Sequence, residues 1–169
     1  MGSGSMKGAE NIYFRCRKEA ARYNDKLNSR ESTAELLGVS VSSLADYELG
    51  NTKVVPVDKV VLMADLYNAP QLLNSYCTTE CPIGCRREMP TEVQPLERTT
   101  LRLLELCADG KLSRAMEQLT HIASDGRVDE CERGKMSAIV DYLDELRLRI
   151  EELALYDERR RRMEHDERR

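Results

Sequence analysis

Residues 29–53 read SRESTAELLGVSVSSLADYELGNTK, and this stretch decides the fold. Its pattern predicts two short helices around a tight turn. Ser29 is a good N-cap for the first helix, and Gly38 can take the positive φ that ends it. Ser40 is a good N-cap for the second helix, which is expected to stop at Gly50.

The second helix, VSSLADYEL, is predicted to have one buried face and one free face. Leu44 and Tyr47 are three residues apart, so they are expected to pack against the first helix. The outer face would carry Val41, Ser42, Ala45 and Asp46. Two helices around a turn, the second with a free outer face, make the helix-turn-helix arrangement.

The run AELLGVSVSSLADYELGNTK resembles the core of the lambda-repressor/Cro-like (XRE) helix-turn-helix family of bacteria, phages and mobile elements. Downstream, PVDKVVLMADLYNAP is similar to the family's fourth helix, and the resemblance covers residues 12–76. Thr33 departs from the family, which usually has a larger apolar residue there. The resemblance implies an all-α fold with a five-helix domain over residues 6–76. The residues that match the motif are Ala34, Leu37, Gly38, Val39, Ser40, Leu44, Tyr47, Glu48 and Gly50.

The resemblance also implies that the second helix enters the major groove of double-stranded DNA. In the family, a polar residue in the first turn of the first helix, here Arg30, touches the DNA backbone. The loop after the recognition helix contacts phosphate, and Lys53 is the best single candidate for such a contact. The expected DNA-binding residues are Ser29, Arg30, Ser40, Val41, Ser42, Ser43, Ala45, Asp46, Asn51, Thr52 and Lys53.

The outer face of the expected recognition helix is weakly equipped for reading bases. It has no Arg, Gln, Asn or Lys, the side chains that make strong bidentate contacts with base edges. Val41 and Ala45 can read thymine methyl groups. Asp46 would be repelled by phosphate unless it accepts from a cytosine amino group or pairs with a neighbouring cation. We therefore expect dimerisation or DNA shape to supply much of the affinity.

Two further helices are predicted in the N-terminal half, over residues 12–27 and 71–76. The 4-4-3 spacing of apolar residues in the first predicts an inward face. That face is Ile12, Cys16, Ala20 and Tyr23, whereas Arg15, Lys18 and Arg22 would project elsewhere.

Three cysteines in the run CTTECPIGC, at positions 77, 81 and 85, begin a predicted linker over residues 77–95. A structural zinc site or an iron–sulfur cluster needs about four ligands, and no fourth ligand is evident. Three alternatives remain open for Cys77, Cys81 and Cys85: zinc or iron–sulfur binding, a disulfide formed by oxidation, and free thiols in a linker.

The C-terminal part, residues 96–169, is predicted to be helical and to form the dimerisation region. Leu101, Leu104 and Ala108 are expected to share one face of a helix. Further on, apolar residues alternate three and four apart, which is typical of a coiled-coil seam. This seam is Met136, Ile139, Leu143, Leu146, Ile150 and Leu153. It can pack on a second chain or on the helices of its own chain.

Charge is distributed unevenly along a chain whose formal net charge is −4. Residues 7–30 hold seven Lys or Arg against three Asp or Glu, while residues 91–157 hold nine basic against fifteen acidic residues. One end of the chain is therefore expected to face phosphate and the other to face protein or water. No signal peptide or membrane-length apolar run is visible, so a cytoplasmic location without a membrane is expected. The first five residues, MGSGS, are interpreted as an expression remnant.

These patterns favour a dimeric, sequence-specific DNA-binding transcriptional regulator, and a repressor in particular. The alternative is a protein-binding module or inhibitor on the same helical fold, encoded by a phage or mobile element. No Gly-rich phosphate loop, H-E-x-x-H run or nucleophile elbow occurs, and only two histidines are present, so the protein is not expected to be an enzyme.

Overall fold

The structure is a computed structural model that describes residues 11–166, and the interpreted expression remnant lies outside the described residues. Regular structure in the described chain is helical, which confirms the all-α prediction. The chain divides into two compact units. The first runs to Thr91 and also takes in the chain from Glu158 onward, and the second spans Glu92–Asp157. Among residues 11–166, none of the helices combines the length and the apolar content needed to cross a bilayer.

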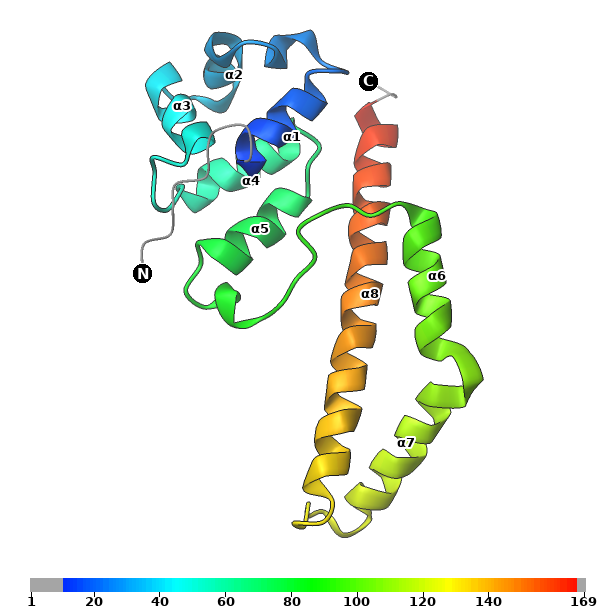
Figure 1. Cartoon of the computed structure of the whole chain (residues 1–169). Helices are drawn as coiled ribbons and strands as arrows, with labels where there is room; N and C mark the ends of the chain where they lie inside the picture. The colour runs from blue at the N-terminus through cyan, green and yellow to red at the C-terminus, as the bar shows by residue number, and fades with distance from the viewer. Residues whose placement is uncertain (1–10, 167–169) are drawn as a thin grey trace. The chain divides into compact units, whose positions relative to one another are not determined.

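Five α-helices form the main body of the first unit, coloured blue to green in Figure 1. Short 3₁₀ turns follow α1 and α5, at Asp25–Leu27 and Gly84–Arg86. The helices are α1 (Ile12–Ala20), α2 (Arg30–Leu37), α3 (Val41–Leu49), α4 (Val57–Leu66) and α5 (Gln71–Thr79).

The ends of α2 and α3 are set by their own local sequence, as predicted. The Ser29 hydroxyl accepts from the Ser32 N–H at 3.2 Å, and the Ser40 hydroxyl accepts from the Ser43 N–H at 3.0 Å. Gly38 ends α2 with φ +60°, a conformation that glycine adopts without steric cost. Each helix therefore begins at a satisfied N-cap and stops within one residue of its expected end.

Helix α1 ends at Ala20, so the prediction of a helix over residues 12–27 is wrong. The Ala20 carbonyl accepts from the N–H groups of both Tyr23 and Asn24, and the chain then enters a separate 3₁₀ turn. Tyr23 is consequently 79% exposed rather than part of the inward face. In its place Arg17 is buried beside Cys16.

The core of the first unit draws on all five helices and on the segments between them. Leu27, Leu44, Met63 and Leu72 are completely buried. Thr33 is buried as well, and its hydroxyl donates to the Ser29 carbonyl at 2.7 Å. This bond satisfies the hydroxyl of a side chain that has no contact with water.

Helix α5 continues to Thr79, three residues beyond its predicted end. Cys77 therefore lies in the last turn of a helix and not in a linker. Gly84 then packs so tightly against α5 that a Cβ at this position would lie 2.4 Å from the Cys77 carbonyl oxygen. The chain after α5 is thus folded back on the helix, and only a glycine fits at the contact.

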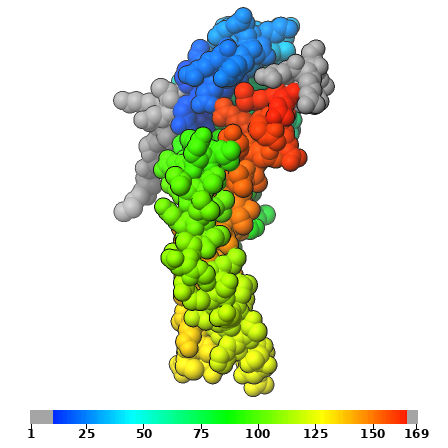
Figure 2. All heavy atoms as spheres, turned by 90° about the vertical axis from the view of Figure 1, so that its right-hand side faces the viewer, coloured from blue at the N-terminus to red at the C-terminus, as the bar shows by residue number. Residues whose placement is uncertain are grey.

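The second unit contains α6 (Leu96–Cys107), α7 (Lys111–Ile122) and the part of α8 (Arg133–Asp166) that precedes Glu158. Helices α6 and α7 follow one another and cover the face of this unit that Figure 2 shows in green and yellow-green. Ala115 and Ile122 of α7 pack on Ile139 of α8. The Tyr142 hydroxyl of α8 donates to the Leu106 carbonyl near the end of α6, at 2.9 Å.

Much apolar surface in the second unit is left outside this core. Leu101 and Leu104 are each 61% exposed and Ala108 is exposed as well, so the face that these three residues are predicted to share is open to solvent. The face of α6 that turns inward carries Thr99, which is completely buried. Other large apolar side chains of the unit are also exposed. They are Leu96, Leu112, Met116, Val128, Val140, Ile150 and Leu153.

Candidate nucleic-acid interface

The outer face of α3 is open to solvent, and its inner face is fixed in the core. Val41, Ser42 and Asp46 are exposed, and Ala45 is half-buried. Leu44 on the opposite face is completely buried. Ser43 is half-buried, and its N–H donates to the Ser40 hydroxyl at the N-cap of α3. This N–H is therefore already used within the helix.

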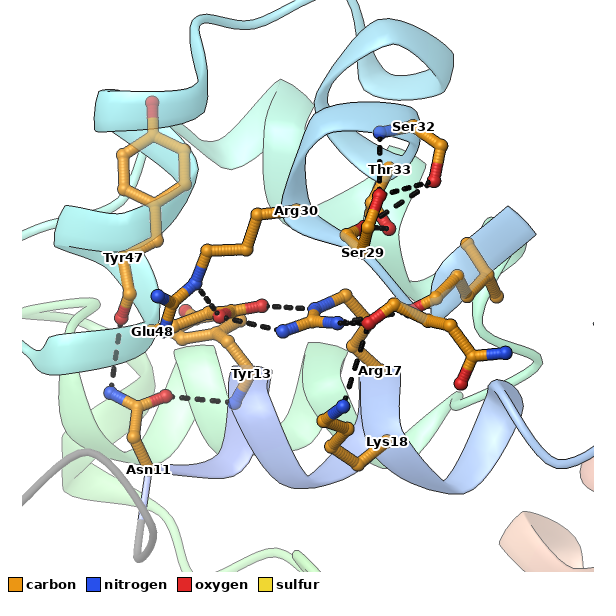
Figure 3. A network of polar contacts seen from close by, with 12 residues as sticks. Asn11, Tyr13, Arg17, Lys18, Ser29, Arg30, Ser32, Thr33, Tyr47 and Glu48 are labelled. Carbon is orange, nitrogen blue, oxygen red and sulfur yellow. Dashed lines mark hydrogen bonds and ion pairs between the residues drawn. The ribbon is translucent and has the colours of Figure 1, made fainter. Parts of the chain in front are cut away.

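An ion-pair network beneath α3 fixes this helix to α1 and α2 (Figure 3). Glu48 is 0% exposed and Arg17 is 2% exposed. The Arg17 Nε and Nη2 atoms donate to the two Glu48 carboxylate oxygens at 2.5 and 3.0 Å, and Arg17 Nη1 donates to the Leu27 carbonyl at 2.9 Å. Two buried charges stabilise each other as an ion pair. If one were removed, the other would stay buried without a counter-charge, which is strongly unfavourable.

Arg30, the predicted phosphate contact of α2, belongs to the same network. Its Nε atom donates to Glu48 Oε2 at 2.7 Å, and about a third of its side chain remains exposed. The guanidinium is therefore oriented by a buried carboxylate. A guanidinium has five N–H donors, so a phosphate can still approach the donors that this bond leaves unused.

Asp46, the acid on the outer face of α3, is held by the loop that follows the helix. Its Oδ1 atom accepts from the Asn51 side-chain amide at 3.0 Å. Its backbone carbonyl accepts from the Asn51 N–H at 2.9 Å and from the Thr52 N–H at 3.4 Å. These bonds connect three of the predicted DNA-binding residues directly, while Lys53 beside them is exposed.

Glu80 fixes the far end of this loop and was not singled out by the sequence analysis. One carboxylate oxygen accepts from the Tyr13 hydroxyl and the other from the Val55 N–H, both at 2.6 Å. Burial and the Glu80 bond both raise the pKa of Tyr13 above its usual range. No local sequence signal could have revealed Glu80, because its two partners are 67 and 25 residues away along the chain.

Asn11 makes a comparable link at the start of α1. Its side-chain oxygen caps the helix by accepting from the Tyr13 N–H at 2.9 Å, and its side-chain nitrogen donates to the Tyr47 carbonyl at 3.1 Å. Figure 3 shows this residue reaching from α1 to α3. The C-terminal part of α3 is thus fixed at two adjacent residues, by Asn11 at Tyr47 and by Arg17 and Arg30 at Glu48.

The three predicted metal-binding cysteines lie at the end of α5 and in the turn after it. Cys77 and Cys81 are half-buried, and Cys85 is exposed. Within residues 11–166, no three His, Cys, Asp or Glu side chains are grouped so as to hold a metal ion. Zinc or iron–sulfur binding at these cysteines therefore stays a prediction. Backbone N–H groups of Gly84 and Ile83 lower the pKa of the Cys81 thiol.

The six residues of the predicted dimerisation seam divide into two groups. Met136, Ile139 and Leu143 pack against α7 of their own chain. Leu146 is half-buried, whereas Ile150 and Leu153 are exposed. The first half of the seam therefore stabilises the unit itself, and the second half is available to another surface.

Comparisons with protein-family models, with curated proteins and with solved structures found no match to this chain.

Proposed function

We propose that the chain is a sequence-specific DNA-binding transcriptional regulator, a repressor, with a lambda-repressor-like domain and a dimeric assembly. The observation that carries this proposal is the outer face of α3, which is exposed while the opposite face is fixed by a buried ion-pair network. A recognition helix must be rigid and accessible at once, because base contacts lose their specificity if the helix can rock in the groove.

Phosphate contacts would come from the residues around α3. Helices α2 and α3 start at Ser29 and Ser40, and their N–H groups favour phosphate. Lys53 and the partly exposed Arg30 side chain would add positive charge near α3. Asn51 and Thr52, in the loop bonded to Asp46, would approach the backbone of the same strand.

Base contacts would come from Val41, Ser42, Ala45 and Asp46. The two apolar side chains suit thymine methyl groups, and Ser42 can donate to or accept from either base of a pair. Asp46 is suited to a cytosine amino group. The Asn51 amide fixes this carboxylate through one oxygen, so the carboxylate is already oriented before DNA arrives.

Dimerisation would be supplied by the second unit and would set the spacing of two DNA half-sites. Its exposed apolar side chains include Leu101 and Leu104 on α6, and Ile150 and Leu153 on α8. The two leucines are three residues apart on α6, and the two α8 residues are three apart as well, so each pair shares a helix face of the kind that often contacts another protein surface. A second copy of the chain matches the two-fold symmetry that a half-site reader requires.

The experiment is an unbiased selection of DNA sequences by the purified protein, followed by titrations at several salt concentrations. Lys53→Ala should weaken binding to all sequences and lower the salt slope by about one unit. Asp46→Ala should instead remove discrimination of about 1–3 kcal/mol at one base pair. The matched control is Asp58→Ala, which removes an exposed acid from α4. If no sequence is enriched even at low salt, the regulator proposal fails.

The alternative, a protein-binding module on the same helices, is favoured by one specific feature. Val57, Val61 and Leu62 of α4 are exposed, and Val54 beside this helix is exposed too. Val57 and Val61 are one turn apart and share a face, so they form a short apolar stripe. Replacing both by Ser should leave DNA binding unchanged if the protein is a regulator. Loss of a protein interaction in this variant, with no DNA selected, would establish the alternative.

A further inference from the structure

The turn that follows α5 brings two cysteines, Cys81 and Cys85, to the two ends of one hydrogen-bonded turn. The Cys85 N–H donates to the Cys81 carbonyl at 3.0 Å, which closes a single helix-like turn between them. Residues joined by such a turn have Cα atoms about 6 Å apart, within the separation that a disulfide spans. The Cα separation is therefore compatible with a disulfide, and the Cys85 thiol, which donates to the Pro82 carbonyl at 3.4 Å, would have to leave that bond.

The same turn stabilises a negative charge on one of these sulfur atoms. The Gly84 N–H donates to Cys81 Sγ at 3.5 Å. Gly84 can hold its N–H there because it lies against the Cys77 carbonyl, where any side chain would collide. The contact between turn and helix thus positions an N–H donor beside the Cys81 sulfur, and such donors favour the thiolate, which is the reactive form of cysteine.

Two other cysteines of the chain, Cys16 and Cys131, lack this arrangement. Cys16 is buried in the core of the first unit, and burial raises its pKa to about 12. Cys131 is exposed, but its thiol donates to Asp129 Oδ1 at 3.0 Å, and this carboxylate disfavours a thiolate. Exposure alone therefore does not distinguish Cys81, whereas its N–H donors and its neighbour Cys85 do.

We propose that Cys81 is a peroxide-reactive thiol that forms a reversible disulfide with Cys85. The Cys81 thiolate attacks one oxygen of hydrogen peroxide, the O–O bond breaks, and the hydroxide released takes up a proton to become water. The Cys85 thiol then attacks the resulting sulfenic acid and expels a second water as the S–S bond forms. Two thiols are oxidised, one peroxide is reduced to two waters, and a dithiol reductant reverses the change.

Closure of this disulfide would act on the candidate interface through Glu80, and this consequence rests on the proposed function. Glu80 directly precedes Cys81 and holds both Tyr13 and the Val55 N–H. A cross-link that starts at the next residue changes the torsions available to the turn. The loop that carries Lys53 ends at Val55, so its position depends on the same carboxylate.

The test uses the whole chain, reduced under anaerobic conditions and then treated with hydrogen peroxide. A protease that cleaves after glutamate separates Cys77 from Cys81 and Cys85 at Glu80. The expected product is one peptide, holding Cys81 and Cys85, that is lighter by two hydrogen atoms and regains them with dithiothreitol. Val55 amide hydrogen exchange should become faster in the oxidised protein, and this readout does not depend on DNA.

Three serine variants separate the roles of the cysteines. Cys81→Ser should abolish the disulfide. Cys85→Ser should stop the reaction at a sulfenic acid that a dimedone probe labels at Cys81. Cys77→Ser, the matched control in the same segment, should still form the disulfide. Oxidation that persists in Cys81→Ser, a Cys77–Cys81 link between two peptides, or preferential labelling of Cys131 would each overturn the proposal.

Discussion

The two units of the chain are both built from helices, short in the first and longer in the second, but they bury their apolar residues to very different extents. Fourteen buried apolar residues form one continuous core in the described part of the first unit, against three in the second. The first unit also satisfies its buried charges internally, through Glu48 and two arginines. The second leaves leucines of α6 and α8 in solvent. The first unit therefore buries its apolar residues within itself, whereas the second leaves the apolar surface that the proposed dimer contact would cover.

The largest effect on the first unit is expected for Glu48→Ala. This change leaves Arg17 buried without its carboxylate, and breaking such a pair costs about 3–5 kcal/mol. The free energy of unfolding, measured by denaturant titration, should fall by that amount. The matched control Glu35→Ala removes an exposed glutamate of α2 and should change it by less than about 0.5 kcal/mol. Equal effects of the two variants would contradict the internal charge balance of this unit.

In the second unit, Ile139→Ala should have the largest effect of any single truncation. Ile139 is the residue of α8 that is buried against α7, and removing a buried Ile side chain costs about 2–5 kcal/mol. We expect the lower part of this range, because several neighbours are partly exposed and can collapse into the space. Val140→Ala, at the adjacent exposed position, is the control. A larger loss for Val140→Ala would mean that the two faces of α8 are assigned the wrong way round.

The effect of protein concentration on stability should distinguish the two units more clearly than any substitution. If a second copy covers α6, the free energy of unfolding per mole of chain in the second unit falls by about 0.7 kcal/mol for each tenfold dilution, half of the tenfold step per mole of dimer. The first unit should show no such dependence. Replacing Leu101 and Leu104 by Asp should give a monomer by light scattering, whereas Leu36→Asp, an exposed position on α2, should not. A wild-type protein that stays monomeric at tens of micromolar rejects this account of the second unit.

The smallest effect concerns Tyr13 and its bond to Glu80. Tyr13→Phe removes one hydrogen bond and should cost about 1 kcal/mol at neutral pH. Because the pKa of Tyr13 is raised in the folded state, its contribution is present below pH 10 and is lost as the pH rises above that value. Tyr13→Phe should therefore weaken the alkaline decline in stability. Tyr23→Phe, at an exposed tyrosine, should leave the decline unchanged.

The ends of α2 and α3 could be predicted from the neighbouring sequence alone. Ser29, Ser40, Gly38 and Gly50 act within one turn of their own position, so their roles can be read from neighbouring residues. The exposed face of α3 followed from the 3.6-residue period in the same way. The all-α class could be predicted from composition and periodicity, since no stretch alternates like a strand.

Long-range contacts account for what the sequence could not show. The burial of Arg17 depends on Glu48, 31 residues away, and an arginine between apolar positions is normally expected in solvent. Tyr23 fits a helical period, but the helix had already ended at Ala20. The exposed leucines of α6 show a different limit of sequence-based prediction. The spacing of apolar residues identifies the apolar face of a helix, but it does not identify the surface that this face contacts.

The Arg17–Glu48 pair restricts how this chain can change over generations. Loss of either partner leaves the other charge buried without a counter-charge. Selection is therefore expected to eliminate single substitutions at these two positions. A joint replacement by apolar residues of similar size carries no such penalty. Descendants of this sequence should therefore differ at both positions or at neither, and a relative that lacks Glu48 should be found to lack Arg17 as well.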